Sequence, residues 1–280
     1  MKVLDLFSGV GGFSLGLERT GGFETVAFCE IDAFPRSILQ RHWPKVPCYH
    51  DIRSISADVL ERDNINVDVI CGGFPCQDVS IAGRGAGIDG SRTGLWREVI
   101  RLAEEINPRY LILENVSKIR SRGLEHLLIA LDEIGYDAEW HCIPAAHVGA
   151  PHRRDRLWII AHRKSDALGP DTHFLRPYPS NMHIDGGTEL RDQQERVPGS
   201  LAWWSSEPAV ERVVDGVPSK LDVARLKAIG NAVVPFIPQM IGMAILKAKA
   251  EGETHSPSDR SAPSIGSTPR IDRTSDGARE

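Results

Sequence analysis

Short apolar runs and amphipathic stretches alternate along the chain up to about Ala161. A short apolar run bounded by glycine or polar residues is typical of a buried strand, whereas apolar positions three or four residues apart predict a helix. The predicted strands are Val3–Phe7, Thr25–Cys29, Cys48–Tyr49, Asp68–Gly72 and Tyr110–Leu113. The predicted helices are Ser14–Arg19, Ala33–His42, Leu95–Ile106 and Leu124–Ile134. This alternation predicts an α/β fold built on a doubly wound sheet.

The pattern changes after the strand pair Tyr136–Ile143 and Arg156–Ala161, which we expect to close the sheet in antiparallel fashion. Ser165 to about Asp215 is rich in Pro, Gly, Asp and Ser, and the regular pattern resumes at Leu226 with an amphipathic helix to about Lys249. The last residues have too little apolar surface to fold. We therefore predict a main domain over 1–164, a short irregular region over 165–225, a returning helix over 226–250 and a disordered tail over 251–280.

Composition narrows the class of protein. The chain has 280 residues, 41% hydrophobic and 25% charged, as expected for a soluble globular protein with one large domain and a small appendage. Its first residues turn acidic too soon for a signal peptide, and we expect no membrane span. The five cysteines lack CxxC or histidine spacing, which predicts a reduced, cytoplasmic protein without a metal site.

The net charge does not by itself indicate a nucleic-acid partner. It is -5, whereas nucleic-acid-binding proteins usually carry a basic surface. The densest group of cations is Pro151–Arg156 with the nearby Arg163 and Lys164. This group is either a surface for an anionic partner or an ordinary solvated face.

A glycine-rich turn, Ser8–Phe13, follows the first predicted strand, so its backbone N–H groups can face a ligand. Glu30 follows the second strand, where a carboxylate can accept hydrogen bonds from both hydroxyls of a ribose. Asp51 and Ile52 follow the third, a usual place for contacts with an adenine. These features favour a nucleotide or S-adenosyl-L-methionine (AdoMet) site, although many Rossmann-like proteins share such a glycine turn.

A cysteine follows the fourth predicted strand. In Gly72–Gln77 two glycines allow close approach to a ligand, and Pro75 stiffens the residue before Cys76. A lone cysteine is as readily a small buried core residue as a nucleophile. Glu114 follows the fifth strand. Because ligands of open α/β sheets bind beyond the carboxyl ends of the strands, we expect Cys76 and Glu114 to share a pocket.

Four segments, in this order, resemble the motifs of the DNA cytosine-5 methyltransferases. Asp5–Gly12 is similar to the first motif, Gly72–Gln77 to the nucleophile loop, Glu114–Val116 to the Glu-Asn-Val motif and Gly230–Pro235 to the last motif. The resemblance covers about residues 1–249. It implies a Rossmann-like AdoMet-dependent methyltransferase sheet with a small irregular target-recognition domain. The implied activity is transfer of a methyl group to C5 of a flipped-out cytosine in a specific DNA sequence.

The resemblance also implies roles for individual residues. Carbon 5 of cytosine is a poor nucleophile, so a thiolate, here Cys76, adds to carbon 6 before carbon 5 attacks the methyl group. Glu114 would protonate or hydrogen-bond ring N3, which needs a pKa raised by burial. The family's Gln-x-Arg-x-Arg reads His152–Arg156 here; Arg156 would orient the base or stabilise the adduct, and Arg154 would brace the loop. The residues expected to bind AdoMet are Phe7, Gly9, Gly11, Gly12, Glu30, Ile31, Asp51, Ile52, Pro75, Leu95 and Asn231.

The expected partner is double-stranded DNA, bound by a monomer, and a cognate restriction endonuclease is not evident from the sequence. The target nucleotide must leave the stack, and the glycine-rich loop Ser80–Gly94 either closes over it or is an ordinary surface loop. Ser165–Asp215 lies where the family carries its target-recognition region. Two other classes stay open. A catalytically silent DNA-binding relative is disfavoured by Cys76, Glu114 and Arg156, and an RNA-directed relative by the form of the Cys76 loop.

Overall fold

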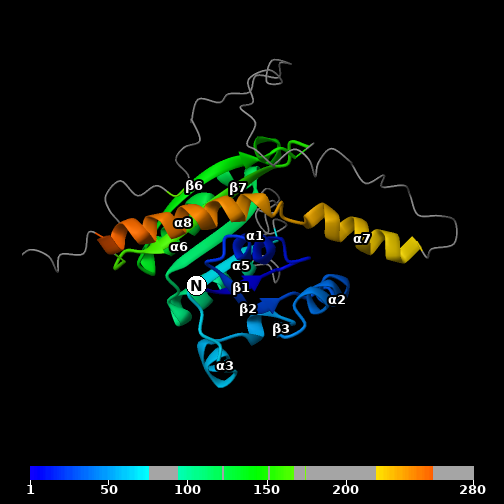
Figure 1. Cartoon of the computed structure of the whole chain (residues 1–280), viewed down its shortest axis with the longest axis horizontal. Coiled ribbons are helices and arrows are strands. Elements are labelled where there is room, and N and C mark those ends of the chain that lie inside the picture. The colour runs from blue at the N-terminus through cyan, green and yellow to red at the C-terminus, as the bar shows by residue number, and fades with distance from the viewer. Residues whose placement is uncertain (76–93, 122, 151, 167–173, 175–218, 255–280) are drawn as a thin grey trace, which may run out of the picture.

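The computed structural model describes residues 1–75, 94–121, 123–150, 152–166, 174 and 219–254 (Figure 1). Its strands are β1 Lys2–Leu6, β2 Glu24–Cys29, β3 Cys48–Tyr49, β4 Val69–Gly73, β5 Tyr110–Val116, β6 Tyr136–Pro144 and β7 Asp155–Arg163. Its helices are α1 Gly12–Glu18, α2 Ala33–His42, α3 Ala57–Arg62, α5 Leu95–Ile106, α6 Leu124–Glu133, α7 Ser219–Asn231 and α8 Phe236–Thr254. The 3-10 helices are η1 Ile52–Ser54, η3 Ser117–Ser121 and η4 Ala145–Val148.

The described strands form one seven-stranded sheet in the order β3-β2-β1-β4-β5-β7-β6. Strands β1 to β5 pair in parallel, and β7 pairs antiparallel with both β5 and β6. This confirms the doubly wound sheet and its antiparallel closing pair. The chain winds outward from β1 to β3 and then returns to the other side of β1 at β4. The switch point therefore lies between β1 and β4, where ligands of such sheets bind.

Helices cover both faces of the sheet, because side chains alternate between the faces along each strand. On one face, strand residues such as Val3, Val69 and Ile112 join Leu17 of α1 and Ile241 of α8 in a buried cluster. Figure 1 shows α8 lying across this side of the sheet. Burial of each such apolar side chain contributes about 1.5–3 kcal/mol, so the two helices stabilise this face.

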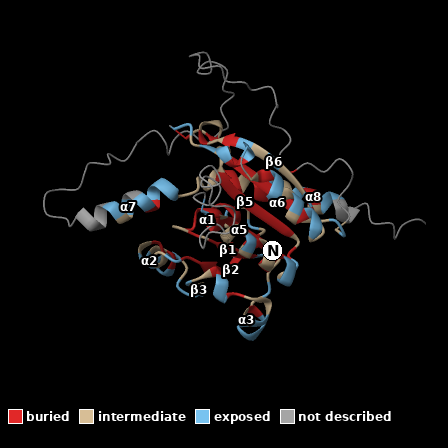
Figure 2. Ribbon diagram, turned by 180° about the vertical axis from the view of Figure 1, so that it is seen from behind, coloured by how far each residue is buried: buried red, intermediate tan, exposed pale blue. Residues whose placement is uncertain are grey.

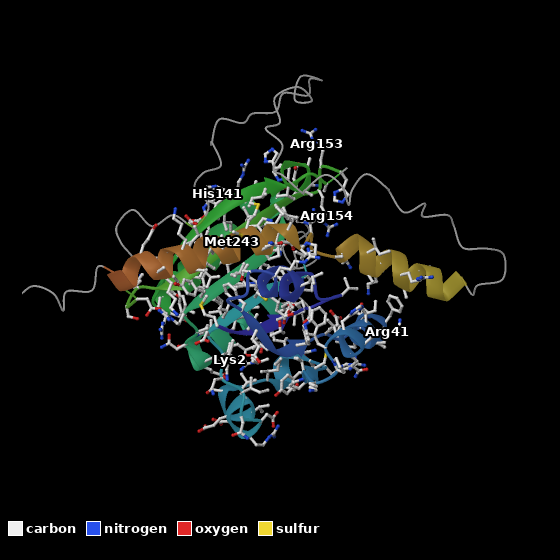
Figure 3. The ribbon with its side chains drawn as sticks, viewed as in Figure 1. Lys2, Arg41, His141, Arg153, Arg154 and Met243 are labelled. Carbon is white, nitrogen blue, oxygen red and sulfur yellow. The ribbon has the colours of Figure 1, made fainter. Side chains whose placement is uncertain are left out.

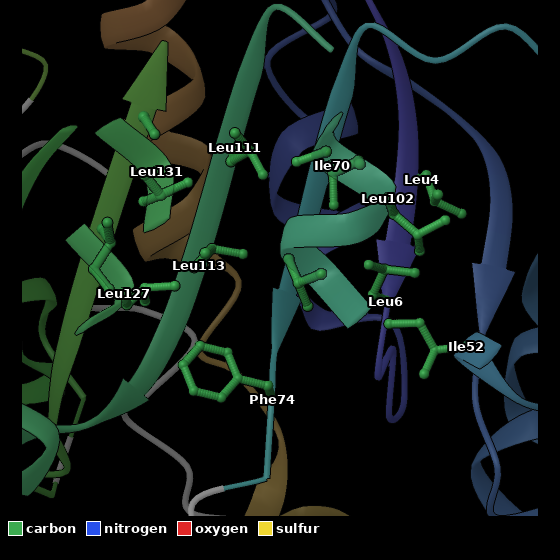
Figure 4. Close-up of a cluster of buried hydrophobic side chains, with 14 of the residues drawn as sticks. Leu4, Leu6, Ile52, Ile70, Phe74, Leu102, Leu111, Leu113, Leu127 and Leu131 are labelled. Atoms are coloured by element: carbon green, nitrogen blue, oxygen red, sulfur yellow. The ribbon is translucent and has the colours of Figure 1, made fainter. Parts of the chain in front are cut away.

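The other face packs against α5 and α6. Figure 4 shows Leu102 of α5 and Leu127 and Leu131 of α6 facing the strand residues. The strand side chains in this cluster include Leu4, Leu6, Ile70, Leu111 and Leu113. In Figure 2 the buried residues gather in the central strands, whereas α7 is largely exposed. The core thus holds the central strands rigidly and leaves their carboxyl ends to carry a site.

The C-terminal segment differs from the prediction of one helix from Leu226 to Lys249. The structure has two helices, α7 and α8, separated by Ala232–Pro235. Pro235 lacks a backbone N–H and disfavours helical geometry in the residue before it, so the first helix ends and a second begins at Phe236. Pro235 also packs against α1, where a Cβ on Gly16 would lie 2.1 Å from its carbonyl oxygen.

Helix α3 was not predicted from the sequence. Its N-cap is Ser56, whose side chain accepts a hydrogen bond from the backbone N–H of Val59. Such a serine is a regular helix-start signal. The helix has six residues and buries only Leu60, so its apolar pattern is too short to stand out.

One stretch, Val223–Glu251, is long and apolar enough by length and composition to cross a membrane. In the structure it consists of α7 and α8 with the break between them. The apolar side chains Ile237, Ile241 and Ile245 of α8 are buried against the sheet. The hydropathy of this stretch therefore reflects a helix that covers the protein core.

Candidate active site

The ends of five strands meet at one edge of the sheet. Leu6 at the end of β1 pairs with Cys29 of β2 and with Gly72 of β4, and Gly73 pairs with Glu114 of β5. Because β7 runs antiparallel, its first residues lie at the same edge, where Arg156 pairs with Val116. The residues predicted to act after each strand are therefore gathered along one edge.

Glu30 links the glycine turn to the end of β2. Its two carboxylate oxygens accept hydrogen bonds from the backbone N–H of Gly9 at 2.7 Å and of Asp32 at 2.8 Å. The side chain is 8% exposed, and each oxygen accepts one bond here, which leaves acceptor capacity for further donors. The Glu30 carboxylate is therefore held in one orientation between the glycine turn and the start of α2.

The glycine turn has the backbone geometry that its sequence predicts. Phe7 and Gly9 have φ of 53° and 54°, and Gly11, which precedes α1, has φ of 84°. This region is open to glycine at little cost, so the turn can bend back at Gly9 and Gly11. Gly12 is buried, and a Cβ there would lie 2.6 Å from the carbonyl oxygen of Val233. Val233, within the last motif Gly230–Pro235, thus packs directly on the glycine turn.

Asp5 is buried beside this turn. From the sequence it was noted only as part of the first motif, Asp5–Gly12, and no role was predicted for it. Its Oδ2 accepts a hydrogen bond from the Ser14 hydroxyl at 2.7 Å, and its backbone carbonyl accepts one from Ser8. Burial raises the pKa of Asp5 to about 7. Asp5 therefore ties β1 to both ends of the turn.

The other predicted AdoMet residues differ in how far they are open to a ligand. Ile31 is 57% exposed, whereas the side chain of Ile52 is buried in the core. Asp51 accepts a hydrogen bond from the backbone N–H of Arg53. Leu95, the first residue of α5, is half-buried, and Pro75 is exposed just past β4. The end of β2 therefore carries a buried carboxylate at Glu30 beside an exposed apolar side chain at Ile31.

Glu114 is paired with Arg156 at the centre of the edge. Arg156 Nε lies 2.9 Å from Glu114 Oε1, and the Glu114 residue is 9% exposed. Burial raises the pKa of the Glu114 carboxyl above its ordinary value, although the charges of Arg156 and Arg154 oppose this rise. The direction of this shift favours the protonated form of the carboxyl.

The segment that leads to Cys76 is attached to the Glu-Asn-Val motif. Asn115 donates a hydrogen bond from Nδ2 to the carbonyl oxygen of Phe74 at 3.0 Å, and its Oδ1 accepts one from the N–H of Val116 at 2.8 Å. A Cβ on Gly73 would lie 2.8 Å from Glu114 Oε2, so a larger residue at this position would displace the Glu114 carboxylate. Cys76 itself lies outside the described residues.

Arg154 connects the start of β7 to α7. Its Nη1 donates a hydrogen bond to the carbonyl oxygen of Gly230 at 2.6 Å. Its φ is 29°, a conformation that costs a residue with a side chain about 1 kcal/mol or more. Asn231, exposed at the end of α7, follows Gly230 directly. Lys227 of α7 also pairs with Asp32 at 2.7 Å, so α7 spans from the arginine segment to the end of β2.

Arg163 and Lys164 do not belong with the cations at the site, which corrects the grouping predicted from the sequence. They lie at the far end of β7, a nine-residue strand that spans about 27 Å. Both are paired there, Arg163 with Asp166 at 3.0 Å and Lys164 with Asp132. Arg153 and Arg154, by contrast, stand at the site edge (Figure 3). His152, in the place of the family's glutamine, is exposed.

Other predicted features lie outside the described residues. These are the loop Ser80–Gly94 apart from Gly94, most of Ser165–Asp215, and the tail beyond Thr254. Within the described ranges no group of three or more His, Cys, Asp or Glu side chains is placed to hold a metal ion.

Comparison with known proteins shows the family to which the chain belongs. The family model for C-5 cytosine-specific DNA methylases matches residues 1–212. The chain therefore belongs to the C-5 cytosine-specific DNA methylase family.

Individual relatives agree with this assignment. The chain is 37% identical over 200 residues to the type II methyltransferase M2.BsuMI of Bacillus subtilis, covering 69% of this chain and 49% of that protein. It is 35% identical over 182 residues to M.Sau3AI of Staphylococcus aureus, covering 59% of this chain and 44% of that protein. The chain thus spans about half the length of the curated relatives it matches.

Solved structures share the fold. A putative DNA modification methyltransferase encoded within an E. coli prophage superposes with a TM-score of 0.50 at 30% identity, over 59% of this chain and 47% of that one. A mutant of DNMT2 from Spodoptera frugiperda superposes with a TM-score of 0.51 at 24% identity, over 60% and 51% of the two chains. The second likeness concerns the fold alone.

Proposed function

We propose that this chain is a DNA (cytosine-5)-methyltransferase that transfers a methyl group from AdoMet to C5 of a flipped-out cytosine in a specific duplex sequence. The observation that carries the proposal is the buried Glu114–Arg156 pair, held beside the Phe-Pro segment that leads to Cys76. In a chain of the C-5 cytosine-specific DNA methylase family, this pair supports the proposal that Glu114 is the acid for ring N3.

AdoMet would be held by the turn after β1 and by Glu30, and it supplies the methyl group. The Glu30 carboxylate would accept hydrogen bonds from the ribose hydroxyls, with Gly9 fixing its orientation. Phe7, Gly11, Gly12, Ile31, Asp51, Ile52, Pro75, Leu95 and Asn231 remain proposed contacts around it. Ile31 is an exposed apolar side chain, which suits the face of an adenine.

The chain's own residues would act on the cytosine. The Cys76 thiolate adds to carbon 6, and carbon 5 then forms the new bond to the methyl group. Loss of the proton on carbon 5 and departure of the thiolate restore the aromatic ring and the free enzyme. Glu114 donates a proton or hydrogen bond to N3 and so limits the negative charge on the ring during addition. Arg156 holds Glu114 and faces the same edge, which suits contact with the base.

Recognition of the sequence would rest with the interval 165–225, between the arginine segment and α7. It contains more acids than cations, so we propose that a few arginines and amides read base edges while phosphate contacts come from the main domain. A cytoplasmic monomer, with or without a partner endonuclease, completes the proposal. A silent DNA-binding relative or an RNA-directed enzyme would use the same fold.

Transfer of tritiated methyl groups from AdoMet discriminates these possibilities. We expect incorporation into duplex DNA and none into transfer RNA, with bisulfite sequencing of DNA from expressing cells revealing one methylated sequence. Incorporation into transfer RNA alone would identify an RNA-directed enzyme. DNA binding without incorporation into either nucleic acid would identify a silent relative.

Replacing Arg154 by alanine is expected to weaken AdoMet binding. The change removes the hydrogen bond to Gly230, so α7 and Asn231 lose their tie to β7. A charged hydrogen bond that is partly solvated contributes about 1.4 kcal/mol, which corresponds to roughly tenfold in affinity. Titration calorimetry with AdoMet measures this. The neighbouring Arg153→Ala serves as the control and should leave AdoMet affinity unchanged; equal affinity for both variants would contradict the bracing role.

A further inference from the structure

Two cations follow directly after the Glu-Asn-Val motif in the 3-10 helix η3. Neither cation is among the site residues predicted from the sequence. Lys118 and Arg120 are exposed, whereas Ile119 between them is buried with 2% exposure. Ile119 anchors η3 in the buried cluster that also contains Leu124 and Leu157, and the two flanking side chains are exposed to solvent.

The position of η3 places these cations at the edge that carries Glu114. Strand β5 ends at Val116, and η3 begins at the next residue. Val116 pairs with Arg156, and η3 contacts β7. Arg120 also lies close enough to Cys142 of β6 for its charge to oppose the rise in that thiol's pKa. Arg120 therefore stands near the start of β7, and Arg153, which precedes that strand by two residues, is exposed.

The charges at this edge are unbalanced although the chain is acidic overall. Lys118, Arg120 and Arg153 make no ion pair with any residue that the structure describes. The acids near them are Asp155, which is exposed, and Glu114, which is buried and forms an ion pair with Arg156. Elsewhere in the described chain many cations are neutralised, for example Arg101 by Glu98 and Glu105.

We infer that Lys118, Arg120 and Arg153 form a phosphate-binding rim that holds the backbone of duplex DNA beside the target cytosine. The inference rests on the proposed function and names the surface that carries the DNA. The rim adjoins the acid that meets the flipped base, so the phosphates it holds are those next to the flipped nucleotide. Such contacts position the duplex without reading its sequence. They also supply non-specific affinity that an acidic recognition interval cannot supply.

Salt dependence of DNA binding tests the rim. Each phosphate contact to duplex DNA adds about 0.9 to the slope of log affinity against log salt concentration. The double variant Lys118→Ala, Arg120→Ala should therefore show a slope lower by about 1.8 than the unchanged protein. The probe is a fluorescein-labelled duplex oligonucleotide of mixed sequence, and binding is followed by fluorescence anisotropy over a sodium chloride series.

Two control variants each remove one cation elsewhere, and their combination matches the charge change of the double alanine variant. Arg41→Ala removes an exposed arginine from α2, on the far side of the sheet from the rim (Figure 3). Lys164→Ala removes a cation paired at the far end of β7. Both should keep the original slope. The charge-conserving double variant Lys118→Arg, Arg120→Lys should also keep it, which separates charge from folding.

The outcomes distinguish the rim from the proposed function. If the unchanged protein methylates duplex DNA and the double alanine variant keeps the full slope, the rim is overturned and the function stands. If the unchanged protein neither binds nor methylates duplex DNA, the proposed function itself has failed. If a duplex RNA probe binds as tightly and loses the same slope, the commitment to DNA is wrong.

Discussion

Replacing Cys76 by serine is expected to abolish methyl transfer to duplex DNA while AdoMet binding persists. A hydroxyl is far less acidic than a thiol, so almost no alkoxide is available to add to carbon 6. Loss of covalent catalysis is expected to lower kcat by about 1,000-fold or more, or more than about 4 kcal/mol of transition-state stabilisation. AdoMet contacts would come from other strand ends, above all from Glu30 at the end of β2.

The measurement is tritium incorporation at saturating DNA, with AdoMet affinity determined by calorimetry on the same preparation. Cys142→Ser is the matched control, because Cys142 is exposed on β6 and has no proposed role in the reaction. A duplex with 5-fluorocytosine at the target position adds a direct test, since its carbon 5 has no proton to lose and the adduct should persist. Substantial turnover by the Cys76→Ser variant would remove Cys76 as the nucleophile.

Replacing Glu114 by glutamine is expected to lower kcat by about 100- to 10,000-fold, the range for loss of a positioned acid. The amide is close in shape to the acid and can still lie near Arg156, but it cannot give up a proton to N3. Glu133→Gln, an exposed position on α6, is the control for charge removal. A Glu114→Gln rate within a few-fold of the original would exclude the acid role.

The pH dependence separates this role from a loss of stability. Because burial raises the pKa of Glu114 despite Arg156 and Arg154, the ionised carboxylate is less favourable in the folded protein than in the unfolded chain. Ionisation of Glu114 therefore lowers the free energy of unfolding as the pH rises above the ordinary carboxyl pKa. The glutamine variant lacks this loss, so its thermal stability relative to the unchanged protein should improve with rising pH while its turnover stays low. If the Glu114→Gln variant instead lost thermal stability and turnover in parallel, Glu114 would have a structural role.

Much of the fold was readable from the sequence because it depends on local patterns. A buried strand such as Val69–Gly73 is a short apolar run, and a helix such as Ala33–His42 is an amphipathic one. The order of these elements restricts the sheet to a doubly wound form, and polar residues after each strand mark its carboxyl edge. Glu30 and Glu114 were identified on these grounds, and both lie at that edge.

The contacts among the site residues were decided by the tertiary structure. Arg154 meets Gly230 across 76 positions in the chain, and Asn115 meets Phe74 across 41. No local pattern encodes such pairs, because they depend on which strands become neighbours and on where α7 returns. The same reason explains the error over Arg163 and Lys164, which are close to Arg156 in sequence but are carried to the opposite end of β7.

The residue types of the site were thus determined by the sequence alone, whereas their partners and electrostatics required the fold. Local apolar patterns decide where strands end, since each strand needs only its own residues to be recognised. The raised pKa of Glu114 needs the sheet and the helices on both faces to exclude water from it. The cations of η3 gain a proposed role only because strand order across the sheet brings β7 against η3.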